Sequence, residues 1–448
     1  MGRLYTGRML RYAILRYLLV VCVLACAAPA RAQWEIRVWH AMSGAQGVEF
    51  ERLAERFNAA QQDYRVVLSY KGSYDETLAA ILATQRRSAR VAPPHIVQIH
   101  ESGTAEMLAR RGLAMPLWQI LEDAGERLDG YLPPVEAPFT DADGRLLALP
   151  ISAATPVLYF NPDALRRAGL APEPPKTWYE MPEVLHALHL AGYMCGYTTA
   201  FPSWVLLENM SAWHDQRFAT KRNGMGGADA RLAFNSRLMV RWISTLSTWR
   251  QSDYFSYSGR GNEAEARFAA GECALLTSSS ASYAALRSRA RFEVGVAQLP
   301  YYDDFDDAPQ NTLAGTAGLW VLAGKPPVEY FGVARFFAFL SQPGVQAEWH
   351  QKSGEIPLTY AAYELTRKQG FYAANPGQEI AVQQVLAKLP TWDSRGIRLE
   401  QFPRIRGIID EELEQVWGGR KSALDALNAA VARGNALLEE LDKTPAAR

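Results

Sequence analysis

The sequence contains few of the residues from which metal sites and nucleophile sites are built. Among 448 residues there are 7 histidines and 4 cysteines, and their spacing matches no zinc site. The chain also lacks the G-x-S-x-G, H-E-x-x-H, G-x-x-x-x-G-K and G-x-G-x-x-G motifs of hydrolases, zinc proteases, phosphate loops and dinucleotide sites. These absences argue against the common enzyme classes, so we predict no catalytic residue, no metal and no cofactor.

Long apolar segments are scarce as well. The one candidate, Leu18 to Ala30, has 13 residues, whereas a helix that spans a bilayer needs about 20. Four arginines precede this segment and Ala30-Arg31-Ala32 follows it, which is the pattern of a secretory signal peptide cut after Ala32. The alternative is a lipoprotein signal that ends at Cys26. Both interpretations predict export.

An excess of positive charge is also missing. Residues 1–32 hold five arginines and no acid, so the rest of the chain carries 42 basic and 47 acidic side chains. This balance argues against a nucleic-acid partner or an anionic-membrane partner. The same part of the chain keeps two cysteines, Cys195 and Cys273. They either form a disulfide or remain two buried thiols, and the sequence leaves both possibilities open.

The pattern of apolar residues predicts two α/β lobes. Segments with strand periodicity alternate with segments of helical periodicity at 34–40, 48–59, 65–70, 77–85, 96–99 and 104–110. This alternation predicts βαβ units and a largely parallel sheet. A second block starts near Ala154 with a strand at 156–160, and residues 312–321 are predicted to return to the first lobe as a strand. Helices are predicted at 204–213, 236–251, 328–340, 343–352, 404–417 and 422–441.

Two cap motifs and a high aromatic content complete this part of the analysis. Asn161 followed by Pro162 is typical of a helix start, and Thr177 with Glu180 has the spacing of a capping box that opens the next helix. The 12 tryptophans and 20 tyrosines are many for this length. Rings with an apolar face and a polar tip suit clefts for sugars and polyols, although they also fill ordinary cores.

Eleven short motifs together carry a family resemblance. They occur at 70–74 (YKGSY), 99–104 (IHESGT), 155–161 (TPVLYFN), 175–178 (PKTW), 195–197 (CGY), 207–209 (LEN), 271–274 (GECA), 308–311 (APQN), 348–352 (EWHQK), 369–372 (QGFY) and 416–417 (VW). The set resembles the periplasmic sn-glycerol-3-phosphate-binding proteins of bacterial ABC importers, in the same order from about Trp39 to the C-terminus.

The resemblance implies a fold and a role. It implies an α/β, two-lobed periplasmic binding protein of type II, similar to the maltodextrin-binding proteins, which closes around a ligand between the lobes. The implied lobes are 33–150 with 312–353, and 151–311 with 354–448. The implied function is capture of sn-glycerol-3-phosphate or glycerophosphodiesters in the periplasm by a monomer. The implied partners are two transmembrane subunits and two ATP-binding subunits of an importer.

The resemblance also assigns roles to residues. Tyr74 and Glu101 match positions that contact the glycerol part, and a carboxylate accepts hydrogen bonds from vicinal hydroxyls. Phe201 and Trp204 match an aromatic platform, Ser279 and Arg406 match phosphate contacts, and Gly315 lies in a loop whose backbone faces the phosphate. For Arg406 the competing interpretation is a salt bridge to Asp410, four residues further along its helix.

Three positions depart from the family pattern. Ala154 replaces a serine, Thr316 replaces a glycine, and Glu355 replaces a tyrosine. A carboxylate at Glu355 beside a phosphate is expected to cost about 3–4 kcal/mol at an effective dielectric of ~20. Two alternatives therefore stand beside the main prediction: a binding protein of the same fold for a sugar or polyol, and an exported glycerophosphodiester hydrolase.

Overall fold

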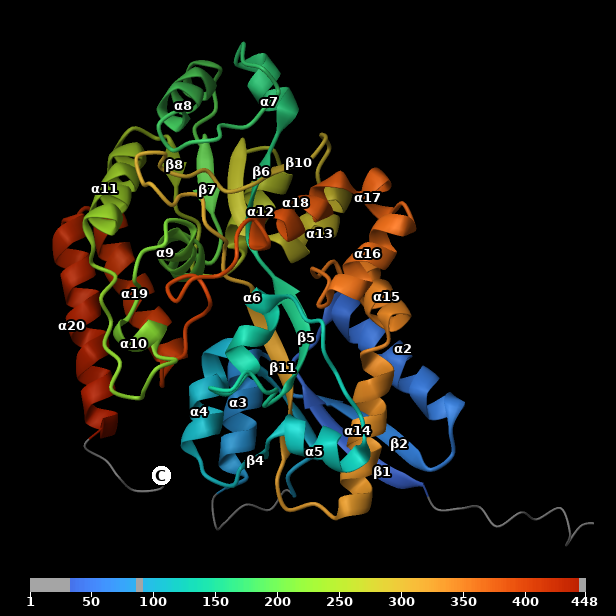
Figure 1. Cartoon of the computed structure of the whole chain (residues 1–448). Coiled ribbons are helices and arrows are strands. Elements are labelled where there is room, and N and C mark those ends of the chain that lie inside the picture. Colours follow the sequence, from blue (N-terminus) through green and yellow to red (C-terminus); the bar gives the residue numbers. More distant parts are fainter. Residues whose placement is uncertain (1–32, 86–91, 443–448) are drawn as a thin grey trace, which may run out of the picture.

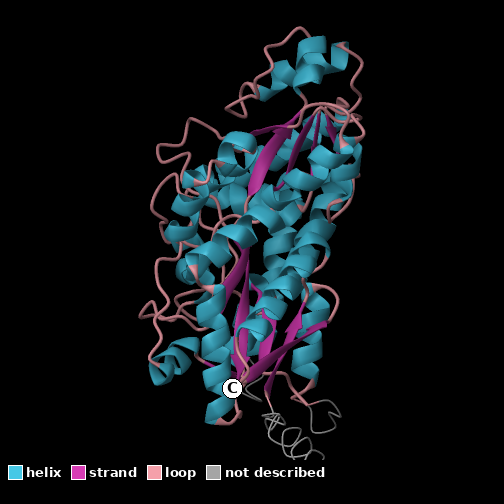
Figure 2. Ribbon diagram, turned by 90° about the vertical axis from the view of Figure 1, so that its right-hand side faces the viewer, coloured by secondary structure: helices cyan, strands magenta, loops and turns pink. Residues whose placement is uncertain are grey.

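The computed structural model describes residues 33–85 and 92–442. The predicted signal peptide at 1–32 lies outside the described residues. The molecule has two sheets, one above the other along its long axis, and helices surround both of them (Figures 1 and 2). The sheet at the bottom of Figure 1 holds the first strands of the chain, as the sequence pattern predicts.

The first sheet contains six strands in the order β2-β1-β3-β11-β4, with β5 also paired to β11. Its strands are β1 (Trp34–His40), β2 (Tyr64–Tyr70), β3 (Ile96–His100), β4 (Ala114–Met115), β5 (Leu149–Ala154) and β11 (Gly315–Leu322). The second sheet contains five strands in the order β10-β6-β9-β7-β8. They are β6 (Pro156–Phe160), β7 (Tyr197–Thr199), β8 (Phe255–Ser256), β9 (Leu275–Ser279) and β10 (Gly295–Ala297).

The prediction of a largely parallel sheet is wrong. Strands β1, β2 and β3 are parallel, but β11 is antiparallel to β3, β4 and β5. The second sheet is also mixed, because β6 is antiparallel to β9 and β10 while β7 is parallel to β8 and β9. The reason is topological. Strand β11 follows the second sheet in the chain, so it enters the first sheet from the edge that faces the second sheet. A strand that follows a βα unit would enter from the other edge.

Two crossings between the sheets lie side by side. The chain leaves the first sheet at Ala154 and starts β6 at Pro156, and it returns through residues 312–314. The hydroxyl of Thr155 donates to Leu313 O at 3.1 Å and to Thr312 Oγ1 at 2.7 Å. Because both crossings are buried and bonded to each other, they form one joint between the two halves of the molecule.

Helices cover both sheets (Figure 1). Those around the first sheet are α2 (Gly44–Ala60), α3 (Tyr74–Ala83), α4 (Thr104–Ala109), α5 (Leu117–Ala124), α14 (Pro327–Leu340) and α15 (Pro343–Ser353). Those around the second sheet are α7 (Pro162–Arg167), α8 (Met181–Leu190), α9 (Asn209–Trp213), α11 (Arg237–Gln251), α12 (Glu263–Ala269), α13 (Tyr283–Arg289), α18 (Pro376–Val385), α19 (Phe402–Trp417) and α20 (Ala423–Asp442). The remaining helices are α6 (Pro133–Glu136), α10 (Thr220–Asn223), α16 (Tyr360–Lys368) and α17 (Phe371–Ala374). Three short 3-10 helices are η1 (Glu101–Gly103), η2 (Ala137–Phe139) and η4 (Ser280–Ser282), and η3 (Ser203–Glu208) is a π-helix.

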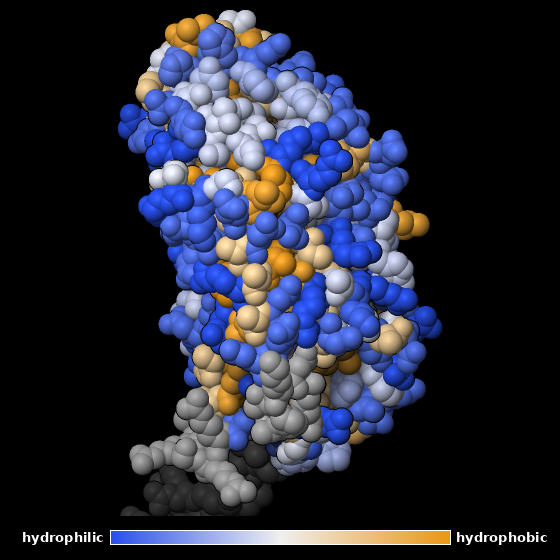
Figure 3. All heavy atoms as spheres, turned by 90° about the vertical axis from the view of Figure 1, so that its left-hand side faces the viewer, coloured by the Kyte–Doolittle hydropathy of each residue, from blue (hydrophilic) through white to orange (hydrophobic). Residues whose placement is uncertain are grey.

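The two capping predictions differ in outcome. Asn161 accepts a hydrogen bond from the Ala164 N–H and caps α7, as predicted. The Thr177 hydroxyl also accepts the Glu180 N–H, but the helix begins only at Met181, because this bond closes a separate turn. Helix α19 buries Ile405, Ile409, Leu413 and Val416 and packs on α20 along the left side of Figure 1. The space-filling view of that side shows a mostly hydrophilic surface with small apolar areas (Figure 3).

Candidate functional site

The predicted site residues follow the ends of strands in both sheets. Tyr74 comes after β2, Glu101 after β3, Phe201 and Trp204 after β7, and Ser279 ends β9. The carboxyl ends of parallel strands meet at one edge of a sheet, and ligand sites of α/β proteins form at this edge. The strand-end positions therefore explain how residues far apart in sequence come together.

Both of these edges face the joint between the halves. In the second sheet, Ser279 pairs with Pro156, the first residue after the crossing. In the first sheet, His100 at the end of β3 pairs with Ala317, two residues after the start of β11. The site residues of the first sheet thus lie toward those of the second.

Tyr74 and Glu101 are held by local bonds in the first half. Ser73 and Glu76 form a capping box that fixes Tyr74 as the first residue of α3. The Tyr74 ring lies 4.9 Å from the ring of His100. The buried carboxylate of Glu101 accepts the N–H and the hydroxyl of Thr316, both at 2.9 Å. Thr316, one of the three departures, therefore orients Glu101.

Arg406 connects the two halves through carboxylates. Its Nε and Nη2 each donate to Glu208 at 2.7 Å, and Nη2 lies 3.7 Å from Glu101 Oε1. The competing interpretation of a salt bridge to Asp410 is wrong, because the guanidinium turns to Glu208 instead, and Oδ1 of the buried Asp410 has no hydrogen-bond partner. The bidentate bond uses two of the five N–H donors of Arg406 and leaves three.

Glu208 is a site residue that the sequence reasoning missed. It is 1% exposed, and its carboxylate fixes the plane of the Arg406 guanidinium. Trp204 and Glu208 are four residues apart, a spacing that places two side chains on the same face of a helical segment. This spacing is the signal that the sequence offered.

Burial changes the protonation of the acids around Arg406. It raises the pKa of Glu101 to about 7, although Arg406 and the Thr316 hydrogen bonds act in the opposite direction. It also raises the pKa of Asp410 to about 7, against the nearby Arg260. Burial lowers the pKa of His100 to about 3, and Arg406 adds to this effect, so His100 is neutral. Because these pKa values lie near neutral pH, a charged ligand that binds beside Glu101 or Asp410 would change their protonation.

Phe201 and Trp204 form a corner of two rings. Their centroids are 6.2 Å apart and their planes are 79° apart. Phe201 has φ 47°, a left-handed conformation that is rare for an aromatic residue and is typical of functional sites. A Cβ on Gly315 would lie 3.0 Å from Cζ2 of Trp204, so a side chain at this position would require the indole to shift.

The position of Trp204 is fixed by the joint. Asn209 donates its backbone N–H and its side-chain amide to the Trp204 carbonyl, and its own Oδ1 accepts the N–H of Leu313. The indole Nε1 is buried and has no partner. Trp204 therefore presents one unused hydrogen-bond donor.

Ser279 stands where β9 meets η4. Its hydroxyl oxygen accepts the Ala281 N–H at 3.3 Å, and its carbonyl accepts the Tyr159 hydroxyl at 2.7 Å. The next residue, Ser280, donates its N–H to Thr155 O at 2.8 Å. The Ser279 side chain therefore lies next to the first crossing.

The other two departures lie in the same region. Ala154 is buried and pairs with Gly315 across β5 and β11. Glu355 is 4% exposed, and burial raises its pKa to about 8. Burial thus favours the neutral acid form of Glu355 near neutral pH, and the repulsion expected of a carboxylate applies only to the ionised form.

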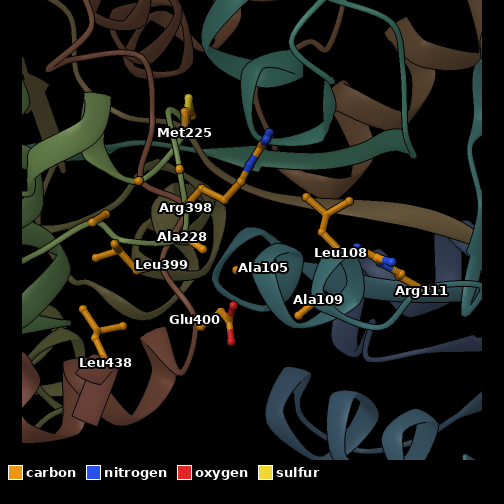
Figure 4. A pocket seen from close by; sticks show the side chains of 13 residues that line it. Ala105, Leu108, Ala109, Arg111, Met225, Ala228, Arg398, Leu399, Glu400 and Leu438 are labelled. Carbon is orange, nitrogen blue, oxygen red and sulfur yellow. The ribbon is translucent and has the colours of Figure 1, made fainter. Parts of the chain in front are cut away.

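A separate cavity of about 330 Å³ lies where α4 faces residues 224–230 and 398–400 (Figure 4). Its lining is largely apolar and includes Leu108, Met225, Leu399 and Leu438, with Arg398 at one side. Arg398 donates to the carbonyls of residues 137, 138 and 140, so it ties the two halves together. None of the predicted ligand contacts lines this cavity, and we assign the candidate site to the cluster around Arg406.

Residues 33–85 and 92–442 contain no group of three or more His, Cys, Asp or Glu side chains arranged to hold a metal ion. Nor do they contain a helix with both the length and the apolar character required to cross a bilayer.

Solved structures share this architecture. A cyclic maltosyl-maltose binding protein of Arthrobacter globiformis superposes with a TM-score of 0.73 at 20% identity, over 91% of this chain and 100% of its own. A glycerophosphocholine complex of Mycobacterium tuberculosis UgpB gives a TM-score of 0.73 at 19% identity, over 92% of this chain and 100% of its own. The two-lobed, maltodextrin-binding-like α/β fold predicted from the sequence is confirmed.

Comparison of sequences defines the family. The family model described as bacterial extracellular solute-binding protein matches residues 52–378, so the chain belongs to that family. The sn-glycerol-3-phosphate-binding periplasmic protein of Yersinia enterocolitica is 46% identical over 429 residues, which is 95% of this chain and 97% of that protein. The protein of the same name from Salmonella typhimurium is 46% identical over 424 residues, 94% and 96% of the two chains. The chain is thus a periplasmic solute-binding protein.

Proposed function

We propose that this protein is the substrate-binding subunit of an ABC importer that captures sn-glycerol-3-phosphate and glycerophosphodiesters. Its relatives named for sn-glycerol-3-phosphate match almost its whole length, and a structural neighbour was solved with glycerophosphocholine. The observation that carries the proposal is that Arg406 of the second lobe reaches Glu101 of the first. Glu101 is bonded to Thr316, and the neighbouring Gly315 packs against Trp204. Lobe closure would bring a guanidinium, a carboxylate and an indole around one ligand.

Each side chain has a chemical role in this proposal. Glu101 accepts hydrogen bonds from the glycerol hydroxyls, with Tyr74 beside it. The three remaining N–H donors of Arg406 and the hydroxyl of Ser279 bind phosphate oxygens. The Phe201–Trp204 corner holds the glycerol carbons or the choline group by ring contacts. The protein binds the ligand as a monomer and releases it unchanged to the importer. The importer consists of two transmembrane subunits and two ATP-binding subunits.

Calorimetric titration tests this proposal. We expect sn-glycerol-3-phosphate and glycerophosphocholine to bind with one site per chain, and maltose and glycerol to bind far more weakly. Incubation with glycerophosphocholine is expected to release no choline. Tight binding of the sugar alone would favour the sugar-binding alternative, and choline release would favour the hydrolase.

Replacing Trp204 with alanine is expected to weaken glycerophosphocholine more than sn-glycerol-3-phosphate. Only the choline ester carries a quaternary ammonium, and its attraction to an indole face amounts to roughly 0.5–2 kcal/mol, a further loss of about 2- to 30-fold in affinity. The variant Trp34→Ala, at the exposed start of β1, is the matched control. Equal losses for both ligands in calorimetry would show that the indole does not contact the choline group.

A further inference from the structure

Glu355 lies at the contact between the two halves. It follows Gly354, which ends α15 with φ +80°. A Cβ on Gly354 would lie 3.2 Å from the carbonyl oxygen of Ala281 in η4, so this loop touches the turn that follows Ser279. The side chain of Glu355 is nevertheless 4% exposed. The backbone before Glu355 thus meets η4, which follows Ser279, and the Glu355 carboxyl itself lies against Gln46 and near Tyr74.

The two carboxyl oxygens of Glu355 differ in their surroundings. Oε1 accepts a hydrogen bond from the side-chain amide of Gln46 on α2. Oε2 is buried and has no hydrogen-bond partner. An unpaired buried polar atom is energetically unfavourable, so a ligand atom that pairs with Oε2 would be favoured.

Among the described residues, the groups that face Glu355 carry no positive charge that would stabilise its carboxylate form. Tyr74 from α3 interacts with both Glu355 and Glu101, and burial raises the pKa of its phenol to about 12, so the phenol is neutral. His350 on α15 contacts the Glu355 carbonyl, and burial lowers the pKa of its ring to about 4. In the described part of the chain no lysine or arginine forms an ion pair with Glu355. Its acid form is therefore favoured at neutral pH.

We propose that Glu355 is a specificity residue for an anionic ligand: as a carboxylic acid it donates a hydrogen bond from Oε2 to a phosphate oxygen, and its ionisation weakens binding. This inference rests on the proposed function. A tyrosine at this position in the family would present a hydroxyl donor, and protonated Glu355 supplies an equivalent donor. The site would then accept a phosphate at neutral pH and bind it less tightly at alkaline pH.

Titration of the wild-type protein with glycerophosphocholine at two pH values tests the inference. A phosphodiester keeps a single negative charge in this range, whereas a phosphate monoester titrates near pH 6. With a pKa of about 8 for Glu355, the dissociation constant is expected to rise about tenfold between about pH 7 and pH 9, since only the acid form donates.

The variant Glu355→Gln distinguishes the titration of Glu355 from the titration of other acids in the site. Its amide still donates a hydrogen bond but does not titrate, so we expect affinity within a few-fold of wild type at pH 7 and little change at pH 9. Glu51→Gln, exposed on α2, should behave as wild type. A second variant, Gln46→Leu, removes a bond that lowers the Glu355 pKa, so the fall in affinity should move to higher pH.

Several outcomes would overturn the inference. A wild-type affinity that does not change with pH would do so, and so would a tenfold fall that persists in Glu355→Gln, since the proton would then belong to another acid such as Glu101 or Asp410. Stronger binding by Glu355→Gln at pH 7 would show that Glu355 repels the ligand as a carboxylate. If the wild-type protein bound neither phosphate ligand at any pH, the proposed function itself would fail.

Discussion

Replacing Arg406 with alanine is expected to abolish high-affinity binding of sn-glycerol-3-phosphate and to destabilise the fold. Hydrogen bonds between charged groups contribute roughly 1.5–3 kcal/mol each, so loss of two phosphate contacts lowers affinity by at least about 100-fold. Calorimetry measures this loss directly. Arg404→Ala is the matched control, because Arg404 is exposed on the same helix two residues away.

The stability effect of Arg406→Ala has a separate cause. The change leaves Glu208, 1% exposed, without its cation, and breaking a buried ion pair from one side costs about 3–5 kcal/mol. Adding Glu208→Gln to Arg406→Ala removes the unpaired charge, so the double variant should recover stability in urea unfolding but not ligand affinity. Unchanged affinity in the single variant would show that Arg406 only holds the lobes together.

Removing the disulfide is expected to cause a loss of stability as large as that of Arg406→Ala. Cys195 and Cys273 are bonded, which settles the choice that the sequence left open, and they are 78 residues apart. For a loop of this length the chain-entropy model gives about 4 kcal/mol. The bond joins the segments that lead into β7 and β9, so it also secures β7, which precedes Trp204, and β9, which ends at Ser279.

Urea unfolding of the double variant Cys195→Ala/Cys273→Ala measures this effect. Wild-type protein unfolded and refolded with a reductant should lose about the same free energy of unfolding, whereas the reductant should not affect the double variant. Both cysteines are fully buried, so reduction needs the unfolded state. Identical unfolding curves for wild type with and without reductant would contradict the prediction.

The sequence predicted most elements because their signals are local. The strands at 34–40 and 156–160 and the helices α14, α15, α19 and α20 have clear apolar periodicity, and their observed bounds agree closely. Helices α16, α17 and α18 were not predicted. The direction of β11 has no local signal, since it depends on where the chain crosses between the halves. The predicted start of α8 at Thr177 is wrong, since the helix begins at Met181. The bond from the Glu180 N–H to the Thr177 hydroxyl occurs both in turns and in helix caps, so the sequence does not distinguish them.

In the candidate site, too, the resemblance identified individual residues but not the contacts between residues far apart in the sequence. The resemblance named Tyr74, Glu101, Trp204 and Arg406, and the structure brings Glu101 to Arg406. It could not show that Glu208 holds Arg406, because that pair is 198 residues apart. Nor could it show the charge state of Glu355, which follows from burial by segments far away in the sequence.

A crystal structure of the protein with glycerophosphocholine is the most direct test of the account. The account predicts one ligand between the two sheets, with its phosphate on Arg406 and Ser279, its glycerol hydroxyls on Glu101, and its choline against Trp204. A ligand bound in the cavity beside Leu108 and Met225, or on the outer surface of either half, would contradict it.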